Sequence, residues 1–301
     1  MTDQLTPPAP PAPPAPPTGP ENGPDHEPGS TPQPAPQPAP QSAKVVAILT
    51  ASLGGAIALA LVGGTVISTV ASVAVSTERQ AVGASGVDAL DVDVSAGSLR
   101  IDFADVDEAS LDVTSGWGSG DWTLERDGDE LVVSSPDWAF GGAWLFGGDV
   151  RAILTLPREL EDTVLDAQFT VSAGDLDASG RFGELDVELG AGAVNVSGAA
   201  REVSADISAG RADLDLTDVQ TADLTLSAGQ LDGRFDGSRP RLVEVNVSAG
   251  SLDLALPDGD YDVTSSVSAG QLDNRLDTSA SASSRIAVEL SAGQVILRSA
   301  D

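Results

Sequence analysis

The phrase Ser-Ala-Gly, set in an alternating apolar pattern, recurs through the last two-thirds of this chain of 301 residues. Seven copies occur, and a degenerate Gly-Ala-Gly fills the one gap between them. The glycines that close these phrases are Gly97, Gly174, Gly192, Gly210, Gly229, Gly250, Gly270 and Gly293. From Gly174 onward they follow one another at intervals of 18 to 23 residues. A period of about 20 residues predicts a stack of similar units.

The apolar alternation changes phase at each of these glycines. Leu224, Leu226 and Ala228 fall on one face of a strand, and the next apolar residue, Leu231, is three positions further on. Two strands can both turn apolar faces inward only if the chain spends an extra residue between them. We therefore interpret the eight glycines as structural corners, with the preceding alanine packed inside each corner. The expected fold class is all-β, a β-solenoid of stacked coils of about 20 residues, and an antiparallel β-sandwich or meander with recurring turns is the alternative.

The N-terminal quarter has a different composition from the repeats. Residues 1–43 hold sixteen of the twenty prolines, so we expect a disordered Pro-rich tail that serves as a spacer or as a ligand for proline-reading modules. Residues 45–75 carry no charge, which predicts a single transmembrane helix over 44–75. Small residues at every fourth position of this segment suggest a homodimer through the helix. Cleavage after the segment is the alternative.

The remaining organisation follows from these assignments. We expect a linker at 76–87, a first coil with a Trp-rich insert or cap at 88–170, and the β-solenoid repeat array at 171–301. A single span that follows a short tail favours a cell-membrane protein with a cytoplasmic N-terminus and an extracytoplasmic C-terminal domain.

All four tryptophans fall between the first coil and the array, and they are Trp117, Trp122, Trp138 and Trp144. This segment also contains Asp127-Gly128 between two short apolar runs, which predicts a β-hairpin. The aromatic residues either cap the end of the stack or form a surface that binds sugars or a protein partner.

The position three residues after each corner glycine is usually polar and outward-facing. In successive repeats it holds Asp177, Asn195, Asp213, Asp232, Asp253 and Asp273. Stacked coils would align these side chains about 4.8 Å apart. Such a carboxylate ladder could bind calcium, but its period differs from that of the known calcium-binding repeat. We interpret it as a solvated acidic face and expect neither a metal nor a cofactor.

Charge and composition exclude several classes of function. The formal net charge is −31, so nucleic acid is not an expected partner. The chain has no cysteine, and its one histidine is His26 in the N-terminal tail. Catalytic machinery based on Ser-His-Asp or Cys-His is therefore absent from the repeats, and carboxylates are too abundant for any one pair to indicate a glycosidase. We expect that the protein is not an enzyme.

Several phrases resemble the bacterial "putative adhesin" domain over about residues 85–299. They are Val94-Ser-Ala-Gly-Ser-Leu99, Val171-Ser-Ala-Gly-Asp-Leu176, Val267-Ser-Ala-Gly-Gln-Leu272 and the strand end Leu154-Thr-Leu-Pro157. That family is a β-solenoid domain of largely unknown function, often attached to a membrane span in envelope proteins. The resemblance implies an envelope-exposed binding or scaffold module and supplies no catalytic residues.

The function expected from these features is a non-enzymatic, membrane-anchored envelope protein whose acidic β-solenoid acts as an adhesin or binding scaffold. Its partners would be a cell-wall polymer or another envelope protein. The alternative is an envelope stress-sensing or regulatory membrane protein that signals through a partner.

Overall fold

The computed structural model describes residues 76–115, 122–136 and 150–300, and these residues form an all-β structure. The first strands are β1 (Ser76–Gly83), β2 (Ala89–Val94), β3 (Gly97–Ala104), β4 (Glu108–Ser115), β5 (Thr123–Asp127), β6 (Glu130–Ser134) and β7 (Arg151–Pro157). A three-residue 3₁₀ helix, Arg158–Leu160, follows. The later strands are β8 (Val164–Ile207), β9 (Arg211–Thr217), β10 (Thr221–Leu226), β11 (Gln230–Asp236), β12 (Leu242–Val247), β13 (Ser251–Leu256), β14 (Asp262–Val267), β15 (Gln271–Asn274), β16 (Arg285–Leu290) and β17 (Gln294–Ser299).

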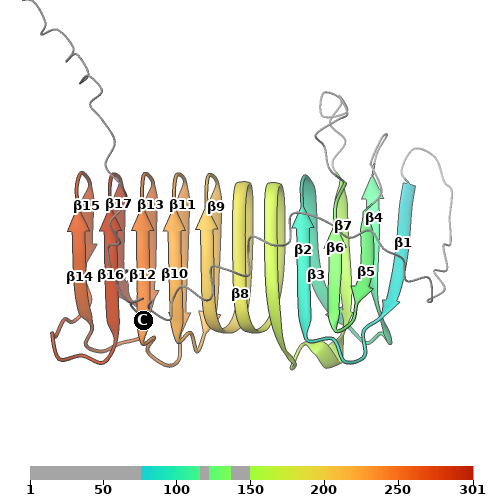
Figure 1. Ribbon diagram of the computed structural model, residues 1–301, viewed down its shortest axis with the longest axis horizontal. Coiled ribbons are helices and arrows are strands. Elements are labelled where there is room, and N and C mark those ends of the chain that lie inside the picture. Colours follow the sequence, from blue (N-terminus) through green and yellow to red (C-terminus); the bar gives the residue numbers. More distant parts are fainter. Residues whose placement is uncertain (1–75, 116–121, 137–149, 301) are drawn as a thin grey trace, which may run out of the picture. The chain divides into compact units, whose positions relative to one another are not determined.

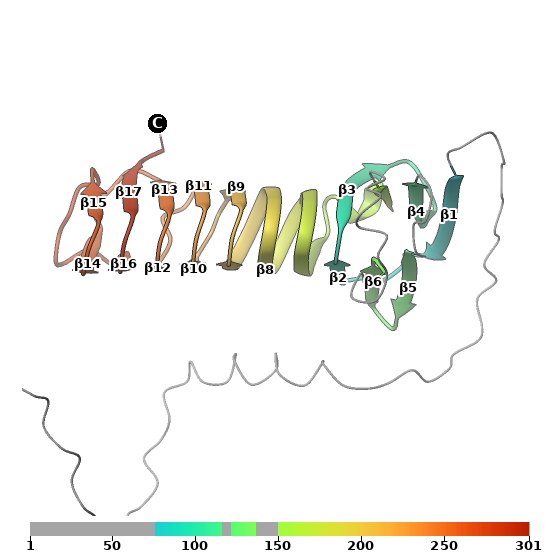
Figure 2. The ribbon, with the colours of Figure 1, turned by 90° about the horizontal axis from the view of Figure 1, so that it is seen from above.

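These strands belong to one mixed 17-stranded sheet that is arranged as two facing rows (Figure 1, Figure 2). One row contains β5, β6, β2, part of β8, β10, β12, β16 and β14, and the other contains β1, β4, β7, β3, another part of β8, β9, β11, β13, β17 and β15. Pairing is parallel from β8 to β17, which we call the parallel region. Strands β1–β7, the mixed region, include the antiparallel pairs β1–β4, β4–β7 and β5–β6.

The Ser-Ala-Gly phrases make the turns between the two rows. At each turn the backbone continues the ladder, as when the Ala228 amide donates to the Ser208 carbonyl at 3.0 Å and the Gln230 amide to the Gly210 carbonyl at 2.9 Å. Gly229 has a φ of +112°, and a Cβ on it would collide with the Gly210 carbonyl oxygen of the adjacent turn. Only glycine combines this backbone angle with so close an approach.

The alanine of the phrase does not occupy the position that the alternation predicts. Ala209, Ala228, Ala249 and Ala292 are all exposed. The chain turns over four residues between the last buried apolar residue of one strand and the first of the next, for example between Leu226 and Leu231. The turn therefore lifts the alanine out of the interior.

The eight corner glycines lie in one row, but not in chain order. Their backbone contacts give the sequence Gly97, Gly174, Gly192, Gly210, Gly229, Gly250, Gly293 and Gly270. Strand β12 pairs with β16 and β13 with β17, so the last two strands of the chain lie between the β12–β13 and β14–β15 pairs. The ten residues 275–284 connect β15 to β16 and allow this exchange.

The apolar side chains explain why the exchange is favourable. The inward residues of β16 and β17, such as Ile286, Val288 and Leu297, are at most 2% exposed. The inward positions of β14 and β15 that pair with Val288 and Leu297 hold Ser265 and Asn274. Placing the more polar unit at the end keeps the more apolar unit covered on both sides.

The core lies between the two rows and consists mostly of valine and leucine, with Phe169, Phe235 and Tyr261 as its largest fully buried side chains. Phe169 packs edge-to-face on Phe182, with ring centroids 5.9 Å apart. The buried Tyr261 hydroxyl donates to the Pro257 carbonyl at 2.6 Å, so its polar atom is satisfied inside the core.

The sequence predicted a β-solenoid that follows a single transmembrane helix, and these observations correct that prediction. The described fold is all-β and is built on one mixed sheet. A solenoid stacks each coil on the next in chain order with parallel pairing throughout. Here three pairs are antiparallel in the mixed region, and the last two units have exchanged places.

The predicted transmembrane helix at 44–75 and the Pro-rich tail at 1–43 lie outside the described residues. Within residues 76–115, 122–136 and 150–300, no helix is long and apolar enough to cross a membrane. This finding corrects the predicted localisation, a single-pass cell-membrane protein with a cytoplasmic N-terminus and an extracytoplasmic C-terminal domain, because the described residues give no support for single-pass anchoring.

Candidate functional site

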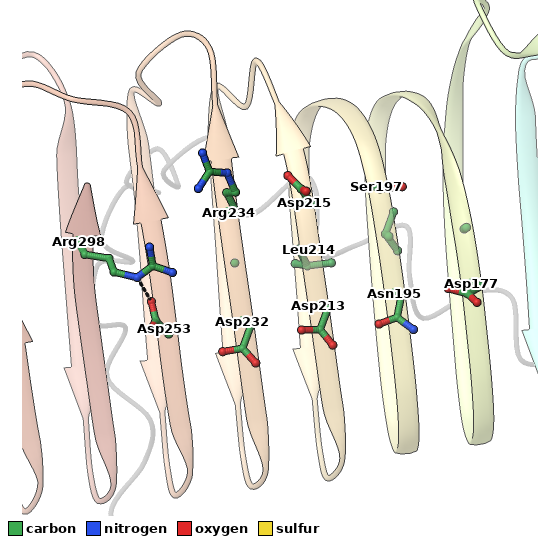
Figure 3. A pocket seen from close by; sticks show the side chains of 13 residues that line it. Asp177, Asn195, Ser197, Asp213, Leu214, Asp215, Asp232, Arg234, Asp253 and Arg298 are labelled. Carbon is green, nitrogen blue, oxygen red and sulfur yellow. Dashed lines mark hydrogen bonds and ion pairs between the residues drawn. The ribbon is translucent and has the colours of Figure 1, made fainter. Parts of the chain in front are cut away.

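A groove crosses the outer face of the parallel region at β8, β9, β11, β13 and β17 (Figure 3). Its volume is about 360 Å³. Two rows of outward side chains line it, one being the predicted aspartate ladder and the other lying two residues further along each strand. The lining residues used below are Asp177, Asn195, Ser197, Asp213, Asp215, Asp232, Arg234, Asp253 and Arg298.

Strand register places the members of the ladder side by side. Asn195 pairs with Asp213, Asp213 with Asp232, and Asp232 with Asp253. Figure 3 shows Asp177 continuing the same row beyond Asn195. Asp273 is separated from Asp253 by Ile296, because β17 lies between β13 and β15. The uninterrupted row is therefore Asp177 to Asp253, and Asp273 is outside it.

Arginines neutralise both ends of this row. Arg100 Nη2 lies 2.9 Å from Asp177 Oδ2, and Arg298 Nε lies 2.7 Å from Asp253 Oδ1. The two side chains of the first pair are about half exposed, so the pair contributes little to stability. Together the arginines leave the negative charge of the row concentrated at its centre.

The centre of the row is the pair Asp213 and Asp232. Partial burial, together with the charge of Asp232, raises the pKa of Asp213, and Arg211 acts in the opposite direction. Gln230 Nε2 donates to Asp232 Oδ2 at 2.6 Å, and Gln230 Oε1 accepts from Arg211 Nη2 at 3.3 Å. These contacts fix the orientation of the Asp232 carboxylate and leave the Asp213 carboxylate facing the groove beside it (Figure 3).

The second row adds donors to the groove. Ser197, Asp215 and Arg234 are neighbours by register, and Arg298 follows beyond Ala255. Arg234 donates to both carboxylate oxygens of Asp236, at 2.8 and 3.2 Å, which holds its guanidinium in place. The groove thus presents fixed acceptors in one row and a hydroxyl and guanidinium groups in the other.

This arrangement is suited to hydrogen bonding along an extended ligand. Acceptors recur at the strand spacing of about 4.8 Å, so a polymer that crosses the strands meets similar groups at regular intervals. Within the described part of the chain, no group of three or more His, Asp or Glu side chains is arranged to hold a metal ion.

A second acidic surface lies on the opposite row of strands. It consists of the outward carboxylates of β8 and β10, namely Asp166, Glu184, Asp186, Glu188, Glu202, Asp206 and Asp223. Burial and neighbouring carboxylates raise the pKa of Glu184 and of Glu188, and burial followed by the charge of Asp206 raises the pKa of Asp223. The sequence did not single out this cluster, because carboxylates occur throughout the repeats.

The predicted tryptophan surface is placed only in part. Trp122 is 2% exposed, and its backbone carbonyl accepts a hydrogen bond from Gln80 Nε2 at 2.5 Å. Its ring lies against Gly97, at the first corner of the glycine row. Trp122 is therefore a core residue of the mixed region. Trp117, Trp138 and Trp144 lie outside the described residues, and their role in binding stays a prediction.

Sequence reasoning did not single out the basic residues of the groove. Arg100, beside the groove, and Arg234, in it, occupy outward positions that hold Asp177 and Asp215 in the adjacent strand. Arg298 takes the outward position that holds Ala255 in the adjacent strand. A comparison of the repeats at matched positions would have found them, because arginines are conspicuous there in a chain with only 15 basic residues.

Comparisons with known proteins give structural likeness at low identity. No family model matches the chain, and no curated protein matches it. A solved structure of a "putative cell adhesion protein" from Clostridium sporogenes is 14% identical, with 74% of this chain and 98% of that chain covered and a TM-score of 0.31. A "putative adhesin" from Bacteroides fragilis is 13% identical, with 75% and 98% covered and a TM-score of 0.41.

A structure named "Putative lipid binding protein" from Parabacteroides distasonis is 12% identical, with 72% of this chain and 96% of that chain covered and a TM-score of 0.39. Most of these names agree with the bacterial family that the sequence resembles. Neither the identities nor the TM-scores are high enough to place the chain in that family or to assign it a function.

Proposed function

We propose that this protein is a non-enzymatic binding protein, an adhesin that holds an extended, hydroxyl-rich or amine-bearing polymer of the cell envelope along the groove of β8, β9, β11, β13 and β17. The observation that supports this proposal most directly is the register of Asn195, Asp213, Asp232 and Asp253, which fixes a row of acceptors at a regular spacing. A rigid row of this kind suits a ligand with a repeating unit, because little ordering of the protein is needed on binding.

The charge of the chain restricts the ligand further. A formal net charge of −31 repels nucleic acid and other polyanions. Hydroxyl and ammonium groups can donate to the carboxylates of the groove, and Arg234 and Arg298 can donate to ring or carbonyl oxygens of the same ligand. The groove is open and not an enclosed cavity, which suits a polymer that enters from the side.

The test is a binding panel of neutral and amine-bearing polysaccharides and peptidoglycan fragments. The variant Asp213→Asn/Asp232→Asn removes the central charges while keeping similar shapes. The matched control is Asp223→Asn/Glu244→Gln, which removes two carboxylates from the other row of strands. Each charge-assisted hydrogen bond contributes about 1.5–3 kcal/mol, so the groove variant should bind its polymer at least about tenfold more weakly, and the control should bind like the wild type.

The same panel separates binding from catalysis. The proposal expects a stable complex and unchanged polymer length after prolonged incubation. Equal binding by the groove variant and the wild type would refute the site. Polymer cleavage that disappears in the groove variant would refute the non-enzymatic assignment.

A further inference from the structure

The parallel region ends in two strands that have a described strand partner on one side only. Strand β14 pairs with β16, and β15 pairs with β17 (Figure 1, red end). The loop that follows β15 pairs with Tyr261, whose amide donates to Asp277, and leaves β14 itself uncovered. Four of the six residues of β14 are exposed. The outer N–H and C=O groups of β14 therefore form an edge that can accept another strand.

Charge is confined to the start of this edge. The Oδ2 atom of Asp262, the first residue of β14, lies 3.9 Å from Arg285 Nε, and residues 263–272 contain no charged residue. The equivalent segments of the neighbouring units each carry a carboxylate, and these are Asp223, Glu244 and Glu289. Native edges are commonly blunted by charge, and here no charge follows Asp262 along β14.

The edge also leaves part of the core open. Val267 is 43% exposed, and Val263 and Leu272 are only partly buried against the core. Their register partners in β16 and β17 are Leu290, Ile286 and Val295, which are all nearly fully buried. A further strand with the same alternation would cover these apolar groups and extend the interior by one layer.

We propose that this edge is an interface with a second copy of the same chain, formed by antiparallel pairing of β14 with β14 of that copy about Ser265. Charge restricts where two copies can meet. Two chains of net charge −31 repel each other, and the uncharged residues 263–272 allow them to approach closely here. A two-fold axis at Ser265 sets Val263 opposite Val267 and Thr264 opposite Ser266. Apolar residues then meet apolar residues inside, and polar residues meet polar residues outside.

The test uses the full-length chain in sedimentation velocity over a range of concentrations. The wild type should form dimers. Ser265 occupies an inward position, but it is exposed because β14 is the last described strand of its row, so a lysine there can reach solvent in the monomer. In the dimer, Ser265→Lys places two like charges against each other at the centre of the interface. Dimer dissociation should become about 100-fold easier or more. Ser227→Lys, the same substitution at an exposed corner of a central repeat, is the control and should dimerise like the wild type.

Mixing two variants tests the two-fold pairing itself. Ser265→Lys and Ser265→Glu should each be monomeric alone, and an equimolar mixture should form heterodimers because opposite charges then meet across the axis. A monomeric wild type would overturn the proposal. This holds also if another segment, such as residues 1–75 or a strand of a different protein, pairs with the edge instead. Dimers that persist in Ser265→Lys, or a mixture that stays monomeric, would overturn it as well. Circular dichroism melting curves verify that each variant is folded.

Discussion

The mixed region and the parallel region hold their strands together in different ways. In the mixed region, side chains bridge separate segments. Gln80 of β1 bonds the backbone of Trp122 and Leu124, and Arg126 of β5 donates to the carbonyls of Gly83 and Ser85 at 2.8 and 2.9 Å. In the parallel region, the backbone ladder and the row of corner glycines repeat from unit to unit. Specific side-chain contacts therefore hold the first strands of the sheet in place, whereas β14 and β15, at the other end of the same sheet, have a described strand partner on one side only.

The largest expected effect comes from the corner glycines. Gly229→Ala should lower the free energy of unfolding by about 4 kcal/mol or more, because the new Cβ meets the Gly210 carbonyl at a φ that L-residues rarely adopt. Gly128→Ala in the hairpin of the mixed region is the control, since its φ is +66° and no atom lies within 4 Å of the added Cβ. It should lose only about 1 kcal/mol. Urea unfolding curves measure both, and equal losses would contradict the close stacking of corners.

A smaller effect separates the middle of the parallel region from its end. Leu224 in β10 is fully buried, so Leu224→Ala should cost about 3 kcal/mol. Leu272 in β15 is only partly buried, and Leu272→Ala should cost about 1 kcal/mol in dilute solution. Hydrogen exchange should correspondingly show faster opening of β14 and β15 than of β10 and β12. Uniform protection across these strands would show that the end unit is as well packed as the middle.

Much of the repeating geometry could be predicted from the sequence. The phase change at glycine locates the turns, and the alternation identifies residues such as Leu224 and Leu231 as inward-facing. These features are local, because they depend on the strand period and on the backbone freedom of one residue. The same reasoning identifies the outward position that Asp213 and Asp232 share.

The rest depends on contacts between distant residues. The exchange of the last two units depends on the difference between an interior that contains Ser265 and one that contains Val288, and on a ten-residue connection that is long enough to cross over. The exposure of Ala228 depends on the shape of a four-residue turn. The antiparallel pairing of β1 with β4 has no counterpart in the repeats, so no comparison of repeats could reveal it.

The smallest expected effect is the change in stability when one carboxylate is neutralised in each region. Asp186 belongs to the second acidic surface. Burial raises its pKa, a hydrogen bond with Ser204 acts in the opposite direction, and the charge of Asp206 raises the pKa further. Because the folded-state pKa lies above the unfolded one, the ionised carboxylate costs stability above the folded pKa, and the cost disappears below the unfolded pKa of about 3.9. Asp186→Asn should therefore stabilise the protein by about 0.5 kcal/mol at pH 7, after allowance for solvent screening.

The control for this change is Asp112→Asn in the mixed region, where Arg79 Nη2 lies 2.6 Å from Asp112 Oδ2. That variant should lose about 0.5 kcal/mol instead, because it removes a charge that has an opposite partner. Thermal melting at pH 7 and pH 3 measures both variants, and the gain of Asp186→Asn should vanish at the lower pH, which lies below the unfolded pKa. A gain that persists at pH 3 would mean that packing, and not charge, is responsible. Losses in both variants would mean that the second acidic surface is neutralised by partners as effectively as Asp112 is, and the electrostatic difference between the two regions would then be absent.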